Sequence, residues 1–142
     1  RICQPAAGSA PPQADTVVPA LRKKLADPDA MVRVWSAFSL FQILPDADPE
    51  IKVLADVVQT RGDAQARIQA AVAIGEMGPR GKGAVPALIA ALSSRSVNRH
   101  AAYALGMIGP DAKDAIGALL RLSGRSGPAA DAARTALEHI RK

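Results

Sequence analysis

Two histidines and two carboxylates are the residues best suited to catalysis in this sequence of 142 residues. His100 and His139 have no carboxylate or cysteine at the spacing of metal ligands, and Cys3 is the only cysteine. The motifs of serine hydrolases, phosphate loops, zinc proteases and CxxC redox pairs are absent from the sequence. An enzyme that excises nucleobases would need a carboxylate in an aromatic pocket, and Glu76 and Asp131 are the nearest candidates by position. We therefore expect no catalytic residue, no metal ligand and no cofactor.

Arginines are the other residues that could bind a ligand. The net charge is +5, and residues 80–142 hold ten Lys or Arg against four Asp or Glu, whereas residues 1–79 hold eight against nine. A basic half can bind nucleic acid or phosphate. Four arginines in predicted turns could form a phosphate-binding ridge: Arg61, Arg95, Arg121 and Arg125. So few cations give only modest, salt-dependent affinity for a phosphate backbone, and solvated turns are the simpler interpretation.

The elements that position these residues are predicted to be helices. Hydrophobic residues make up 49% of the chain but aromatic residues only 3%, and alanine and leucine make up the difference. Both have high helix propensity, and the alternating β-branched runs of strands are missing. No apolar run approaches the roughly 20 residues that span a bilayer, so no membrane insertion is expected.

One stretch of sequence occurs twice. Residues 73–88 read AIGEMGPRGKGAVPAL and residues 104–119 read ALGMIGPDAKDAIGAL, with identical residues at half of the positions. Leucines continue this spacing along the chain: Leu21, Leu54, Leu88 and Leu119. The pattern predicts helical hairpins. The predicted domain is 15–142, its units are 15–45, 46–79, 80–110 and 111–142, and the Pro/Ala-rich residues 1–14 are a predicted flexible linker.

Capping residues mark the ends of the predicted helices. Asp29 and Asp63 stand where N-caps are needed, before the second helix of units one and two. The pairs at 78–79 and 109–110 are both Gly-Pro, which stops a helix. Inside the second helices, Gly75 and Gly106 are predicted to let a neighbouring helix come close.

Phe41 and Glu138 replace that glycine in the first and last units. Terminal repeats have only one neighbour and are often atypical, so these two replacements are consistent with an array that ends near both places.

Three of these segments, 27–43, 63–78 and 96–109, resemble the HEAT repeat, and most of all the short bacterial HEAT-like type also found in phycobilin lyases. The resemblance covers about residues 15–142. It implies an all-α, right-handed α-solenoid of about four helical hairpins. It also implies that an aspartate and an arginine tie neighbouring units together. Arg33 and Arg67 match that arginine, but Asn98 and Ala130 replace it in the last two units, and Ser94 and Ser126 replace the aspartate. The ties are therefore expected to be weakest toward the C-terminus.

The same resemblance implies that the second helix of each hairpin lines a concave face. Helical spacing predicts five buried residues in the second unit: Ala66, Ala70, Ala73, Ile74 and Met77. The opposite side of this helix and its equivalents gives the predicted partner-binding surface: Trp35, Phe38, Gln69, Val72, Arg99, His100 and Tyr103. Three of the four aromatic residues of the chain lie there, as in many interaction sites. Alternatively, residues 1–14 or an upstream domain cover Trp35 and Phe38.

The function that this pattern favours is a non-enzymatic protein–protein interaction or scaffold module, a fragment or accessory domain of a larger bacterial protein. Its partner would be another protein or a neighbouring domain of the same polypeptide. One alternative is a nucleic-acid or phosphate-binding domain that uses the basic C-terminal half. Another is an accessory domain of a secreted or periplasmic enzyme. The compartment, the oligomeric state and the identity of the partner stay open.

Overall fold

The computed structural model describes residues 14–44 and 48–142, and within them it contains helices and turns but no strand. The α-helices are α1 (Ala14–Lys24), α2 (Ala30–Ile43), α3 (Asp48–Gln59), α4 (Ala64–Met77), α5 (Val85–Ala91), α6 (Asn98–Ile108), α7 (Ile116–Ser123) and α8 (Pro128–Arg141). Two 3₁₀ segments, η1 (Gly78–Ala84) and η2 (Gly109–Ala115), lead into α5 and α7. The predicted linker lies outside the described residues, apart from Ala14, which begins α1.

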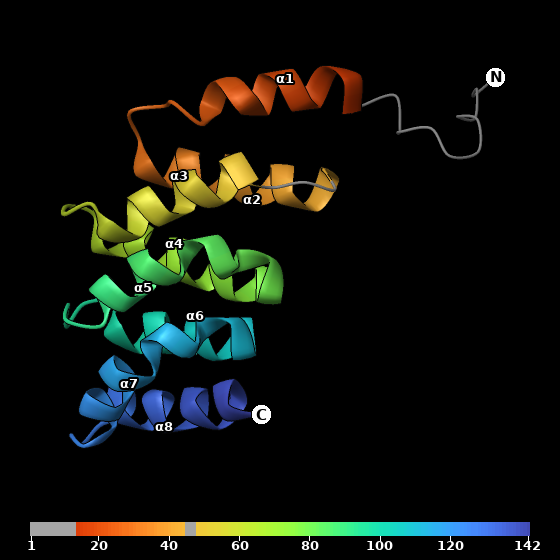
Figure 1. The fold of residues 1–142 in the computed structure, drawn as a ribbon. Coiled ribbons are helices and arrows are strands. Elements are labelled where there is room, and N and C mark those ends of the chain that lie inside the picture. The colour runs from red at the N-terminus through yellow and green to blue at the C-terminus, as the bar shows by residue number, and fades with distance from the viewer. Residues whose placement is uncertain (1–13, 45–47) are drawn as a thin grey trace.

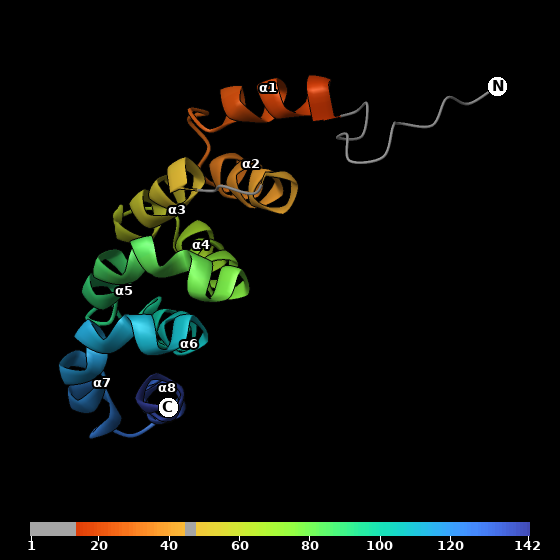
Figure 2. The same cartoon turned by 45° about the vertical axis from the view of Figure 1, so that its right-hand side comes forward.

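The helices stack as successive antiparallel pairs, which makes an elongated array with the N-terminal and C-terminal hairpins at opposite ends (Figure 1). Helices α3, α5 and α7 follow one side of the array, and α2, α4, α6 and α8 follow the other (Figure 2). The array curves toward the even-numbered helices, so these line its concave face (Figure 2). The prediction of an all-α solenoid is confirmed.

Helix boundaries follow the predicted caps. The Asp29 carboxylate accepts a hydrogen bond from the backbone N–H of Met31 at 2.8 Å, and the Asp63 carboxylate accepts one from Gln65 at 2.9 Å. Gly78 and Gly109 end α4 and α6 with φ values of 60° and 81°. A side chain at either position would be strained, so glycine is what lets the chain leave each helix at this angle.

The core consists of leucines from the odd-numbered helices packed against alanines of the even-numbered ones. Leu54, Leu88 and Leu119 are fully buried, but Leu21 of α1 is only half-buried. All five residues predicted to be buried in α4 are in the core. Alanine suits these positions because a small side chain lets the helices pack closely.

Gly75 and Gly106 lie where the even-numbered helices come closest together. A Cβ atom on Gly106 would lie 2.9 Å from the Cα of Ala136 in α8, and one on Gly75 would lie 2.9 Å from Cε2 of Tyr103 in α6. Both distances are shorter than non-bonded contacts allow. The predicted close approach is therefore confirmed at both glycines.

The expected aspartate–arginine ties take a different form. Asp29 and Asp63 only cap their own helices, and no described residue forms an ion pair with Arg33 or Arg67. Arg33 donates to the backbone oxygen of Asp27 at 2.7 Å, within its own hairpin. Only Arg67 reaches the next repeat, where its guanidinium lies 3.3 Å from the hydroxyl of Ser94. The expectation was wrong for the other three residues: each carboxylate bonds through Oδ1 to the start of its own helix, and Arg33 bonds within its own hairpin.

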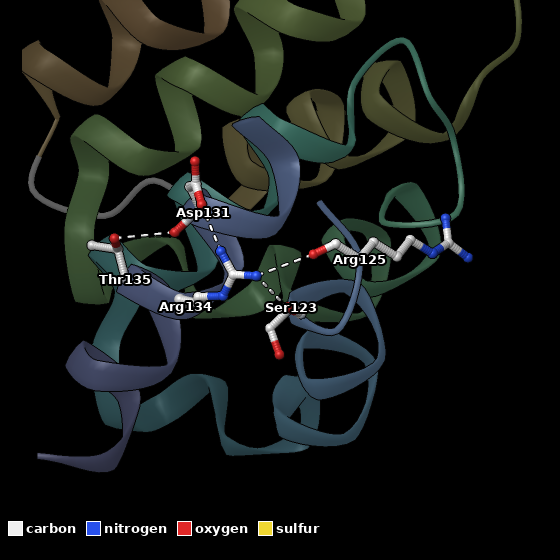
Figure 3. Close-up of polar contacts among 5 residues, drawn as sticks. All are labelled: Ser123, Arg125, Asp131, Arg134 and Thr135. Atoms are coloured by element: carbon white, nitrogen blue, oxygen red, sulfur yellow. Dashed lines mark hydrogen bonds and ion pairs between the residues drawn. The ribbon is translucent and has the colours of Figure 1, made fainter. Parts of the chain in front are cut away.

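The last hairpin has a polar tie that the repeat pattern does not predict. Arg134 of α8 donates to the backbone oxygens of Ser123 at 2.9 Å and Arg125 at 3.1 Å, and it forms an ion pair with Asp131 at 2.6 Å (Figure 3). It binds the end of α7 much as Arg67 binds the carbonyl of Val58 at the end of α3. Arg134 lies one helical turn later than the position where the repeat pattern has its arginine, so the pattern did not reveal it.

Candidate functional site

The concave face carries the residues predicted to bind a partner. Trp35 on α2 is 64% exposed and Tyr103 on α6 is 42% exposed. Arg99 is exposed as well, and the remaining predicted residues are half-buried: Phe38, Gln69, Val72 and His100. Every predicted residue of this surface is therefore at least partly accessible to solvent among the residues that the structure describes.

The aromatic residues of α2 differ in how they are held. Phe38 stacks on Phe41, with 6.0 Å between the ring centroids, and the guanidinium of Arg80 lies 4.3 Å from the Phe41 centroid. A cation over a ring face is attracted to its π electrons, so Phe41 connects the first repeat to η1. Trp35 makes no ring contact of this kind with any residue that the structure describes, and most of its side chain is exposed to solvent.

A pocket of about 220 Å³ lies on the concave face between α6 and α8. Its walls include Tyr103, Met107 and His139, and its base includes Gly106 and Ala136. The close approach at Gly106 brings the two helix backbones together, so the small residues form the base and the larger ones the rim. Met107 is 41% exposed, which adds a second large apolar side chain beside Tyr103. The pocket has the size and lining to accept one apolar side chain.

His100 lies on α6 about one helical turn before Tyr103 and does not line this pocket. Burial of the ring, and to a lesser extent the nearby charge of Arg99, lower the pKa of His100 below its ordinary value of 6.5. Its Nδ1 atom is buried and has no hydrogen-bond partner among the described residues. The imidazole is therefore neutral at pH 7.

The described residues do not bring the two candidate carboxylates or a set of metal ligands together. No three residues of the types His, Cys, Asp and Glu are close enough there to hold a metal ion. Glu76 is exposed on α4 and Asp131 is paired with Arg134, and neither carboxylate lines the pocket between α6 and α8. The aromatic pocket with a carboxylate that base excision would require is not formed by these two residues.

The four arginines of the predicted phosphate-binding ridge are all exposed. Arg61, Arg95 and Arg125 lie in the turns that follow α3, α5 and α7, on the side of the array that we call the turn edge. The prediction was wrong for Arg121, which lies in the last turn of α7 because that helix continues to Ser123. Arg61 lines a pocket between the first two hairpins, whereas Arg121 and Arg125 line another, of about 170 Å³, between α5 and α7. Arg95 lines neither pocket.

Comparison with known protein families agrees with this geometry. The family model for HEAT repeats matches residues 51–138. No curated protein and no solved structure matches the chain significantly. HEAT repeats are generally protein-interaction or scaffold modules and are typically non-enzymatic. Among the described helices, none is both long and apolar enough to cross a membrane. The chain belongs to the HEAT repeat family.

Proposed function

We propose that this chain is a non-enzymatic interaction module that docks a segment of a protein partner, or of a neighbouring domain, along its concave face. The observation that carries the proposal is the exposure of Trp35, Tyr103 and Met107 on that face. Large apolar side chains that stay accessible on a folded surface favour association, and tryptophan and tyrosine are the commonest anchors at interfaces.

The pocket between α6 and α8 supports the same proposal. A docking segment would place one apolar side chain against Tyr103 and Met107, and its backbone would run past the polar side chains of Arg99 and Gln69 toward Trp35. Burying one leucine-sized side chain contributes about 1.5–3 kcal/mol. Two or three such anchors are needed to offset the entropy lost when the segment is ordered.

Peptides selected from a random displayed library against the whole chain provide the test. We expect peptides that shift the NMR signals of Trp35 and Tyr103, and we expect Trp35→Ala or Tyr103→Ala to weaken their binding about tenfold or more. Leu120→Ala is the matched control, because Leu120 is an equally exposed apolar residue (45%) that lies on α7, away from the concave face. Peptides whose binding depends on Leu120 and ignores Trp35 and Tyr103 would contradict the proposal.

Nucleic-acid binding through the turn edge is the second candidate, because Arg61, Arg95, Arg121 and Arg125 are exposed in or next to the turns that follow α3, α5 and α7. Retention of double-stranded DNA at rising salt concentration separates the two candidates. Retention that Arg95→Ala and Arg125→Ala abolish, but Trp35→Ala leaves intact, would favour the nucleic-acid function. The proposed protein docking predicts weak retention that disappears at physiological salt.

A further inference from the structure

A pocket of about 380 Å³ opens at the turn edge between the first and second hairpins. Three arginines from three segments line it: Arg33 of α2, Arg61 from the turn after α3, and Arg67 of α4. Asp29 and Asp63 line it as well. The sequence predicts Arg61 in a ridge with Arg95, Arg121 and Arg125, but the structure brings it together with the two arginines of the repeat pattern.

The two carboxylates do not neutralise these cations by direct pairing. The Oδ1 atom of Asp29 and that of Asp63 accept the backbone N–H groups at the starts of α2 and α4. In the parts of the chain that the structure describes, no ion pair joins either carboxylate to Arg33, Arg61 or Arg67. The pocket therefore holds three positive guanidinium groups against two negative carboxylates, each of which bonds through Oδ1 to the start of its own helix.

Two of the three guanidinium groups are fixed in place. Arg33 is half-buried and donates through Nη1 to the backbone oxygens of Asp27 and Pro28, at 2.7 and 3.1 Å. Arg67 is half-buried and donates through Nε to the oxygen of Val58 at 2.9 Å.

These hydrogen bonds do not use all the N–H donors of Arg33 and Arg67. A guanidinium has about five N–H donors, and no described residue accepts from Nη2 of Arg33 or of Arg67. A side chain that is already ordered loses little entropy when it binds a ligand.

We propose that this pocket binds a phosphate group, either a free phosphate ion or the phosphate of a phosphorylated side chain. A phosphate monoester carries about −1.5 to −2 charges at pH 7 and three terminal acceptor oxygens, so it can accept from all three arginines at once. The Nε and Nη2 donors of Arg33 form a planar fork that matches a pair of phosphate oxygens, and Nη2 of Arg67 can donate singly. The site lies on the turn edge, away from the concave face, and does not rest on the docking proposed above.

Titration of the whole, isotope-labelled chain with inorganic phosphate tests the proposal. We expect saturable shifts of the Nε–H signals of Arg33 and Arg67, beyond those that sodium chloride causes at equal ionic strength. Arg61→Ala is expected to weaken binding about two- to fivefold, because Arg61 is exposed and its contribution is screened. Arg33→Lys keeps the charge but loses the fork, and it is expected to weaken binding about tenfold.

Arg95→Ala is the matched control, because Arg95 is an exposed arginine in the corresponding turn of the third hairpin and does not line the pocket. It should leave the affinity for phosphate unchanged. Equal shifts with chloride, or shifts spread evenly over Arg95, Arg121 and Arg125, would overturn the proposal. Trp35→Ala should not alter the titration, so failure of the concave-face docking and failure of this site are distinguishable.

A second arm identifies the source of the phosphate. The probes are a Gly/Ser heptapeptide with a central phosphoserine and the same peptide without phosphate. Tighter binding of the phosphopeptide than of inorganic phosphate assigns the site to a phosphorylated partner, whereas equal affinities assign it to the free ion. Equal binding of both peptides would overturn the proposal, because the contact would then not depend on the phosphate group.

Discussion

The first and last hairpins of this array have the same pattern of leucines, but they are packed very differently. Leu119 of α7 is fully buried, whereas its equivalent in α1, Leu21, is only half-buried. Val17 of α1 is 36% exposed, although its equivalent before α7, Ala115, is fully buried. None of the residues 16–24 of α1 belongs to the buried set, and α1 packs chiefly against α2 (Figures 1 and 2).

The inner helices of the two hairpins show the same contrast. Ile43 at the end of α2 is 42% exposed, and its equivalent in α8, Ile140, is 1% exposed. At the glycine position of the inner repeats, α8 carries Glu138, an exposed charged residue. The exposed side chains of α8 are therefore mostly polar, whereas α1 and α2 leave the large apolar side chains of Val17, Trp35 and Ile43 accessible.

A lysine explains part of this difference. Lys24 of α1 occupies the register position of Val57, Ala91 and Leu122, which are all buried in the core. Burying an unpaired ammonium group would cost far more than the packing would return, so this turn of α1 stays at the surface. Leucine spacing alone therefore does not bury a helix: α1 packs chiefly against one neighbour, α2, and carries a lysine where the other units have an apolar residue.

The largest expected change in the free energy of unfolding is at Leu119, and Leu21 is the equivalent leucine with which it is compared. Leu119→Ala removes a fully buried side chain and is expected to lower the free energy of unfolding by about 2–5 kcal/mol. Leu21→Ala should cost only about 1 kcal/mol, because Leu21 is already partly in contact with water. Chemical denaturation of both variants measures the difference, and hydrogen exchange shows whether α7 or α1 opens first. Equal losses would mean that α1 is as firmly packed as α7, contrary to the exposures described above.

A smaller loss of stability is expected at the contact between α6 and α8, where Gly106 packs against Ala136. Gly106→Ala would place Cβ 2.9 Å from the Ala136 backbone, so α6 and α8 must move apart. We expect a net loss of about 1–2 kcal/mol, after allowing for the gain of about 1 kcal/mol that alanine brings to a helix.

Gly75→Ala is the matched variant for this junction. Its Cβ would meet mainly the Tyr103 ring, which is 42% exposed and can rotate aside, so thermal unfolding should show little or no loss. A stabilised Gly106→Ala variant would contradict the close packing of α6 against α8.

The smallest change in the free energy of unfolding is expected at Trp35, in the first hairpin. Trp35→Ala should change the free energy of unfolding by less than about 0.5 kcal/mol, because the indole is 64% exposed. The alternative that residues 1–14 cover Trp35 predicts a loss of about 2 kcal/mol or more. Denaturation of Trp35→Ala with and without residues 1–13 separates the two cases, and a large loss that truncation removes would show that the segment covers the indole.

Much of the fold could be predicted from local sequence. The sequence predicted the caps at Asp29 and Asp63 and the Gly-Pro stops correctly, because each acts on its own helix within a few residues. The close approach of neighbouring helices at Gly75 and Gly106 could also be predicted, because small residues recur where repeats pack together. The predicted surface residues are accessible, because helical spacing alone sorts the two sides of an amphipathic helix.

Contacts between separate hairpins could not be predicted in this way. The pairing of Arg67 with Ser94, the tie that Arg134 makes to the end of α7, and the pocket between α6 and α8 all depend on how far one repeat is rotated on the next. A rotation of a few degrees moves a side-chain tip by more than a hydrogen bond tolerates, and no local pattern specifies it.

The sequence by itself determined the helices, their ends and the order in which they stack, because these follow from propensity, capping and apolar spacing within each repeat. The tertiary structure alone decided that α1 is half-packed, that Trp35 faces solvent, and that Arg33, Arg61 and Arg67 share one pocket. The physical reason is that exposure and charge clustering are properties of a surface, and the surface is assembled from residues that the chain keeps far apart.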